Sequence, residues 1–124
     1  MDAQDTAKAI LSSVPTGLWI GGEEQSRTST FDVLNPSDDE VLIKIADATA
    51  EDAIAALDAA SAVHPEWAAT PPRKRGEILR SVFETITAHA DDIAALMTLE
   101  MGKVVAESKG EVTYGAEFFR WFAE

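Results

Sequence analysis

The 124-residue sequence has 46% apolar residues, which fits one folded domain, and its lack of cysteine excludes disulfides, thiolate metal sites and cysteine nucleophiles. Its 22 acidic side chains against 10 basic ones give a formal net charge of −12, so nucleic acids and anionic membranes are not expected as partners. No apolar run reaches the roughly 18 residues of a membrane-spanning helix, and the polar, acidic start at Met1 to Asp5 does not resemble an export signal. The chain is therefore expected to be cytoplasmic.

Residues 1–16 are expected to form a flexible arm. Several apolar residues in it have helical spacing, but Ser12, Ser13 and Pro15 would end any helix early. A helix this short is marginal in water, so the arm would need a surface on which to dock.

Between Leu18 and Ile45 the pattern predicts three short strands joined by turns. The apolar run 18–20 is followed by Gly21-Gly22, a pair suited to a tight hairpin. Residues 30–34 and 41–45 alternate in polarity around the turn-forming segment 35–39. So few strands make a poor sheet by themselves, and we expect this portion to lie against a partner surface.

Two helices are predicted in the middle of the chain. The first would begin after a Thr49 cap, with acidic residues in its first turn, and stop near His64-Pro65 or Trp67. The second would begin at Thr70-Pro71-Pro72, with threonine as the cap and proline at the first helical position.

Two further helices complete the predicted order. The third starts at Asp91-Asp92, includes Val104, and ends or bends at Gly102-Lys103. The last runs from about Val105 to the end of the sequence, with an apolar register at Val112, Gly115, Ala116, Phe119 and Phe122. The expected fold class is α+β and mostly α-helical, with short amino-terminal β-hairpins followed by about four helices.

The last residues of the sequence form a dense aromatic cluster at 118–122. Burying one such side chain is worth about 1.5–3 kcal/mol, so several aromatics in a final turn indicate a chain cut within a helix. We therefore expect the sequence to be a fragment.

No complete catalytic constellation is present in the sequence. The adjacent carboxylates are expected to face water, and His64 and His89 lack the spacing of a helical metal pair. The cluster 73–75 could bind an anion at a helix amino terminus or, more simply, form a solvated face. The glycine-rich nucleotide motifs are absent, so no residue is assigned a catalytic role.

The segment Leu96-Met97-Thr98-Leu99-Glu100-Met101-Gly102-Lys103, followed by Ala106-Glu107-Ser108-Lys109-Gly110-Glu111-Val112 and Trp121-Phe122-Ala123-Glu124, resembles the amino-terminal half of aldehyde dehydrogenases. It is most similar to bacterial succinate-semialdehyde dehydrogenases. Earlier motifs agree in order, including the hairpin at 18–23 and the Asn-Pro turn at 35–36. The sequence departs from the family at Gln25, and at Asp38-Asp39, where the family usually has Thr-Gly.

The resemblance implies that residues 17–124 are the incomplete amino-terminal portion of a cofactor-binding domain with an α/β fold. It further implies NAD(P)-dependent oxidation of an aldehyde to the acid, with succinate semialdehyde as the expected substrate. The family's catalytic cysteine, catalytic glutamate and cofactor-binding glycines come later in its chain. The fragment alone is therefore expected to be inactive and to bind no cofactor, whereas the full-length enzyme would use NAD or NADP. Its partners would be the remainder of the enzyme chain and, in a homo-oligomer, further copies.

Two site roles follow from the resemblance. Tyr114 matches a position that borders the substrate tunnel in some relatives, although it could simply be a helix-packing tyrosine. Glu100 matches an acidic position that helps to hold a monovalent cation, together with backbone carbonyls near Val33 and Leu34; the alternative is a solvated or salt-bridged glutamate. A different class of function, an acidic helical interaction module without catalysis, stays open.

Overall fold

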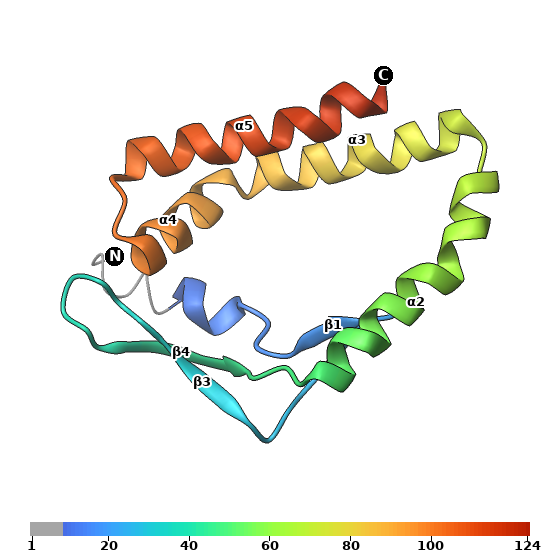
Figure 1. Ribbon diagram of the computed structural model, residues 1–124. Coiled ribbons are helices and arrows are strands. Elements are labelled where there is room, and N and C mark those ends of the chain that lie inside the picture. The colour runs from blue at the N-terminus through green and yellow to red at the C-terminus, as the bar shows by residue number, and fades with distance from the viewer. Residues whose placement is uncertain (1–8) are drawn as a thin grey trace.

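The computed structural model describes residues 9–124 and contains four short strands followed by four long helices (Figure 1). This architecture confirms the expected α+β class with mostly helical content. Figure 1 shows α3, α4 and α5 together in one layer, the strands in another, and α2 joining the two along one side. None of the helices in the described part is both long and apolar enough to cross a membrane.

The described half of the expected arm lies beside the strands, while residues 1–8 lie outside the described part. Residues 9–13 are helical, and the hydroxyls of Ser12 and Ser13 each donate a 2.8 Å hydrogen bond to the backbone carbonyl three residues earlier. The chain then passes next to the strands, where the Thr16 carbonyl accepts a 2.8 Å hydrogen bond from the amide of Ala46.

The first hairpin pairs β1 (Leu18–Ile20) with β2 (Glu23–Gln25) in antiparallel register. Gly21 and Gly22 take φ angles of 65° and 85°, which confirms the predicted glycine turn. The strand β2 was not predicted, because a run of three polar residues carries no strand signal. One of them, Glu24, accepts hydrogen bonds from the amides of Thr16 and Gly17 and so fixes the approach of the chain.

The second hairpin pairs β3 (Thr30–Leu34) with β4 (Val41–Ala46), with an irregularity in register between Val33 and Leu34. The Asn35 carboxamide oxygen accepts hydrogen bonds from the amide and hydroxyl of Ser37, which confirms the predicted turn. Asp39 takes a φ of 60°, a left-handed conformation that suits the glycine usual in the family at this position.

Helix α2 (Ala50–Ala69) begins as predicted, because Thr49 and Asp52 form a reciprocal capping box. Of its two predicted ends, the one at His64-Pro65 was wrong, because the helix continues through Pro65. The other, near Trp67, lies two residues before the observed end. Inside a helix, a proline removes one backbone donor and its ring crowds the carbonyl four residues earlier, which is why an end was predicted at Pro65. The last turn is closed by the amide of Thr70, which donates to the Glu66 carbonyl at 3.0 Å.

Helix α3 (Pro72–Ala88) has no side-chain cap, so the predicted capping role of Thr70 was wrong. The Thr70 hydroxyl instead donates to the Glu66 carbonyl at 2.9 Å, at the end of the preceding helix. Pro71 and Pro72 have no amide hydrogen, and so fewer donors need a cap at this end.

Helix α4 (Ala90–Met101) ends at Gly102, and helix α5 (Val105–Ala123) follows almost directly. The prediction that Val104 belongs to the third helix was wrong, because Gly102 takes a φ of 71° and redirects the chain, leaving Val104 as the cap residue of α5. A Cβ at Gly102 would lie 3.1 Å from Cγ of Pro36. The loop after α4 therefore packs on the Asn-Pro turn.

The interior of the described part is small and lies mainly where α5 packs on α3 and α4. Its buried apolar residues are Ala46, Ala94, Val112 and Ala116. Ser108 is fully buried and shares a 3.0 Å hydrogen bond with the hydroxyl of Thr98. Helix α2 buries no residue, and β1 is its main contact.

A charged pair connects the loop after β2 to the start of α2. Arg27 Nη2 lies 2.5 Å from Oδ1 of Asp52, and Nε of Arg27 lies 3.1 Å from the same atom. The hydrogen bonds from Arg27 and then from the Thr49 amide hold the pKa of Asp52 well below its usual value of 3.8. Asp52 thus takes part both in the capping box of α2 and in the ion pair with Arg27.

Replacing Gly102 with alanine should destabilise the chain by about 1–2 kcal/mol, because a Cβ is unfavourable in the left-handed region and would press on Pro36. The measurement is urea unfolding followed by far-UV circular dichroism. The control is Gly110→Ala in α5, where a Cβ meets nothing within 4 Å and a more stable helix is expected. Equal midpoints for the two variants would contradict the role given to Gly102.

The contribution of Asp52 should depend on pH in a defined direction. Because its folded pKa is lowered, the stabilisation is fully present above its ordinary pKa of 3.8 and is lost as the pH falls toward the lowered value. Asp52→Asn should therefore lower the urea midpoint at neutral pH, and the difference from the natural chain should shrink in acid. Asp58→Asn, at an exposed position on the same helix, should have no such effect. A pH-independent difference would contradict the assignment.

Candidate functional site

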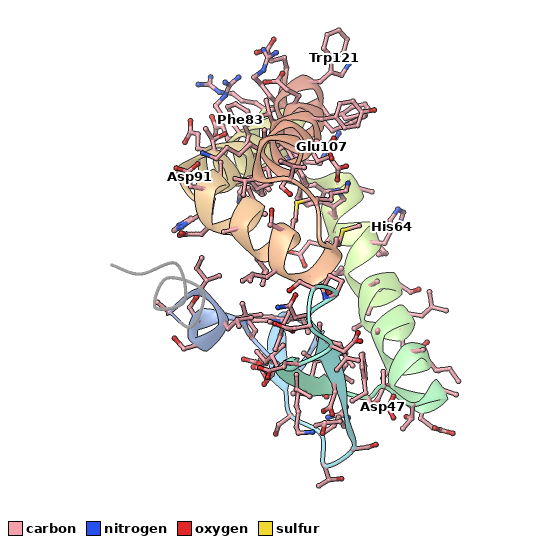
Figure 2. The ribbon with its side chains drawn as sticks, turned by 90° about the vertical axis from the view of Figure 1, so that its left-hand side faces the viewer. Asp47, His64, Phe83, Asp91, Glu107 and Trp121 are labelled. Carbon is pink, nitrogen blue, oxygen red and sulfur yellow. The ribbon has the colours of Figure 1, made fainter. Side chains whose placement is uncertain are left out.

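The candidate site is a row of aromatic side chains on the outer side of α5, which we call the aromatic face: Tyr114, Phe118, Trp121 and Phe122. Their spacing of four, seven and eight residues from Tyr114 places them on one side of the helix. Tyr114 and Phe118 form an edge-to-face pair with ring centroids 5.1 Å apart. Figure 2 shows Trp121 projecting away from the helical layer, and 75% of its surface is exposed.

These residues and Glu117 line an open groove of about 340 Å³. The Glu117 carboxylate accepts hydrogen bonds from Nε and Nη2 of Arg120 at 2.8 and 2.5 Å, and this contact raises the pKa of the Arg120 guanidinium. The pair largely neutralises its own charge. The groove is therefore suited to apolar or aromatic groups, and it contains no nucleophile paired with a base.

The structure places Tyr114, the predicted substrate-tunnel residue, in this groove with 68% of its surface exposed. It does not pack between helices. The expected register of the last helix holds for Val112 and Ala116, which are buried, but not for Phe122, which is 69% exposed on the aromatic face. The recurrence of aromatics from Tyr114 onward was the signal that could have identified the whole face.

Two of the three residues predicted to hold a cation share one cavity. Val33 and Glu100 both line a cavity of about 210 Å³ between the end of the arm, the second hairpin and α4, whereas Leu34 is not part of its lining. The rest of the lining is apolar: Leu11, Val14, Pro15, Leu42, Ile43, Ile45 and Leu96. A hard cation takes several oxygen ligands. The cavity offers one carboxylate, so the fit is partial and the cation role stays a prediction.

The other charged side chains singled out in the sequence form hydrogen bonds or ion pairs with nearby residues. Within residues 9–124, no group of three or more His, Asp or Glu side chains could hold a metal ion. In the basic cluster, Arg73 pairs with Glu77 at 3.1 Å, and Nη1 of Arg75 donates to the carbonyls of Thr70 and Ala68. Lys103 forms an ion pair with Glu111. These contacts favour the structural interpretation of the basic cluster.

The described residues do not fit a dinucleotide. Such a site requires parallel strands joined through a helix, with a glycine-rich turn and a helix amino terminus at the phosphates. The strands in residues 9–124 instead form two separate antiparallel pairs. Gly102 and Lys103 end a helix and begin no phosphate loop.

Comparison with known proteins gives consistent matches over this region. The Aldehyde dehydrogenase family model matches residues 22–124. Over 84 residues, the chain is 60% identical to "Succinate-semialdehyde dehydrogenase" of Paenarthrobacter nicotinovorans, covering 68% of this chain and 19% of that protein. Over 108 residues it is 41% identical to "Succinate-semialdehyde dehydrogenase [NADP(+)] GabD" of Escherichia coli (strain K12), covering 87% and 22%.

Solved structures agree with the sequence matches. The fold is similar to betaine aldehyde dehydrogenase from Staphylococcus aureus in complex with NAD+, with a TM-score of 0.91 and 30% identity over 99% of this chain and 25% of that one. An E. coli NADP dependent enzyme gives a TM-score of 0.84 and 40% identity, covering 87% of this chain and 23% of that one. The chain thus spans about a fifth to a quarter of the length of these proteins.

The exposure of Trp121 predicts a fluorescence result. A collisional quencher should reach Trp121 more readily than Trp19 and Trp67, which are 62% and 38% exposed. Trp121→Phe should therefore remove the most readily quenched part of the emission, whereas Trp67→Phe should leave it in place. Stern–Volmer quenching with acrylamide measures both. Identical quenching of the two variants would show that Trp121 is already covered.

Proposed function

The chain belongs to the aldehyde dehydrogenase family, and from this premise we propose that it is the amino-terminal segment of an enzyme that oxidises succinate semialdehyde to succinate with NAD or NADP. The observation that carries the proposal is the 60% identity to a succinate-semialdehyde dehydrogenase. The E. coli relative is named for NADP(+), and the S. aureus structure contains NAD+, so support exists for either cofactor.

In this proposal the segment contributes structure to the enzyme and leaves the bond-making steps to the rest of the polypeptide. The resemblance assigns the reaction to a cysteine thiolate and a glutamate, and this chain has no cysteine. The cofactor, bound elsewhere in the enzyme, would accept the hydride. The antiparallel strand pairs described above support a scaffold role and offer no cradle for pyrophosphate. We accordingly propose that the segment alone is inactive.

Tyr114 is the residue of this segment best placed to touch substrate. Its ring, packed against Phe118, would form an apolar wall beside the aldehyde chain. The groove is open on its other side, so a second wall from the rest of the enzyme would have to complete it and exclude water. Arg120 is committed to Glu117, and recognition of the substrate carboxylate would therefore come from other residues.

The whole enzyme is proposed to be cytoplasmic and homo-oligomeric. The strongly acidic composition supports solubility at neutral pH. Glu100, with carbonyls near Val33 and Leu34, is proposed to contribute to a monovalent cation site that other oxygen ligands complete. The location of Val33 and Glu100 on one cavity supports this role.

The second candidate function, an autonomous acidic interaction module, has one supporting observation, the exposed aromatic face. It requires a fold that is stable without further protein. The buried apolar residues of the described part are three alanines and a valine, which is little interior for a segment that extends from residue 9 to residue 124. We therefore favour the enzyme segment.

The test is a covalent fusion of this chain to the remainder of the P. nicotinovorans enzyme. The fusion should reduce NAD or NADP in the presence of succinate semialdehyde, with a kcat/KM at least about tenfold above that for betaine aldehyde. The chain alone should show no reduction above background. The measurement is cofactor absorbance during steady-state turnover.

Each contrary result has a distinct meaning. Turnover by the isolated chain would contradict the proposed inactivity. A fusion that prefers betaine aldehyde would contradict the proposed substrate. The matched control is the natural P. nicotinovorans enzyme, whose activity is the reference value for the fusion.

A further inference from the structure

The described part of the amino-terminal arm, residues 9–15, lies across the cavity of about 210 Å³ that Glu100 lines, and we call this segment the strap. Figure 1 shows its short helical turn between α4 and the second hairpin. Leu11 and Val14 are half-buried and line the cavity, whereas Ser12 is exposed and lies outside the lining. The strap thus covers the cavity with apolar side chains and leaves its hydroxyl groups in water.

Polar contacts hold the base of the strap, whereas apolar contacts hold the strap itself. Oε1 of Glu24 accepts hydrogen bonds from the amides of Thr16 and Gly17 at 3.0 and 2.8 Å. The Thr16 carbonyl also accepts a hydrogen bond from the amide of Ala46. In the described part of the chain, every hydrogen bond of residues 9–15 joins two members of the strap. A segment attached in this way opens more readily than the rest of a fold.

The charge of Glu100 opposes closure of the strap. The other lining residues are all apolar, and Glu100 lies at the edge of the cavity, since it is partly exposed. The nearby Lys103 is paired with Glu111, and none of the ion pairs within residues 9–124 includes Glu100. Apolar groups that cover an unpaired carboxylate remove water from it, which costs free energy unless a positive charge is close. A cation bound at Glu100 removes this cost.

We propose that the strap is a cation-responsive cover: a monovalent cation bound at Glu100 favours the closed strap, and loss of the cation lets the strap move away from the cavity about its base at Thr16. This inference rests on the proposed function, which assigns a cation to Glu100. One carboxylate balances one positive charge, which favours a monovalent over a divalent ion. Because such coupling is reciprocal, the closed strap also strengthens cation binding.

The experiment uses the absence of cysteine from the chain, which allows single thiols to be introduced. Val14→Cys places a thiol on the cavity side of the strap, and Ser12→Cys places one at an exposed position of the strap. Val112→Cys places one in the buried interior at α5. Each chain is labelled with iodoacetamide, an uncharged thiol reagent, in potassium chloride and in tetramethylammonium chloride at equal ionic strength. Mass spectrometry gives the labelling rates.

Val14→Cys should react at least about fivefold more slowly in potassium chloride than in tetramethylammonium chloride, a coupling of ordinary size between two sites. Ser12→Cys should react rapidly in both salts. Val112→Cys should react more slowly than Val14→Cys in both, because its exposure requires the interior to open. Adding Glu100→Gln to Val14→Cys should give slow labelling in both salts, because a neutral amide does not oppose closure. Glu107→Gln, at an exposed position outside the cavity, should retain the effect of potassium.

Three results would overturn the inference. The first is an equal labelling rate of Val14→Cys in the two salts, and the second is a potassium effect that survives Glu100→Gln. The third is an equal rate for Val14→Cys and Val112→Cys, because the strap would then open only together with the whole fold.

This outcome is separate from that of the proposed function. An active fusion together with labelling that is equal in the two salts would overturn the strap inference alone. An inactive fusion together with a potassium effect that depends on Glu100 would overturn the proposed enzyme activity and support the cation response of the strap.

Discussion

The packing of α5 on α3 and α4 is the interaction on which the rest of the structure depends. Small residues allow it: Ser108 and Ala116 of α5 are buried at the contact, together with Ala94 of α4. A Cβ at Gly76 of α3 would lie only 2.5 Å from the carbonyl oxygen of Ala123, so the two helices approach closely there. Close packing of small side chains fixes geometry, but each one buries little area and contributes correspondingly little hydrophobic free energy.

The remaining features follow from this limited interior. The large apolar side chains have no room inside, and so they point outward from α2, from the hairpins and from the aromatic face. The loops that connect the layers depend on specific polar contacts, such as Arg27 with Asp52 and Glu24 with the amides of the arm. The fold closely matches one quarter of an intact aldehyde dehydrogenase, which is consistent with a segment whose outward faces are interior faces of a larger molecule.

Local signals in the sequence predicted most of the elements. The Thr49 cap, the glycine turn and the start of α5 each depend on residues within a few positions of one another, and all three were confirmed. The errors arose at residues that are typical of a helix end but can take another position. Thr70 closes α2 and does not cap α3, and Pro65 lies inside α2. The site was harder to predict from local signals. Only the family resemblance placed Val33 with Glu100, and the exposure of Phe122 depends on how distant elements pack. The periodicity of apolar residues in a sequence identifies an apolar face, but it does not say whether that face packs against the same chain or against another one.

Residue-resolved hydrogen exchange of the isolated chain tests most directly whether its interior is confined to α3, α4 and α5. The account predicts strong protection of amides around Val112 and Ala116 in α5, and weak protection throughout α2, which buries no residue. Protection of α2 equal to that of α5 in the isolated chain would contradict it, because α2 would then be held by an interior that the present account does not contain.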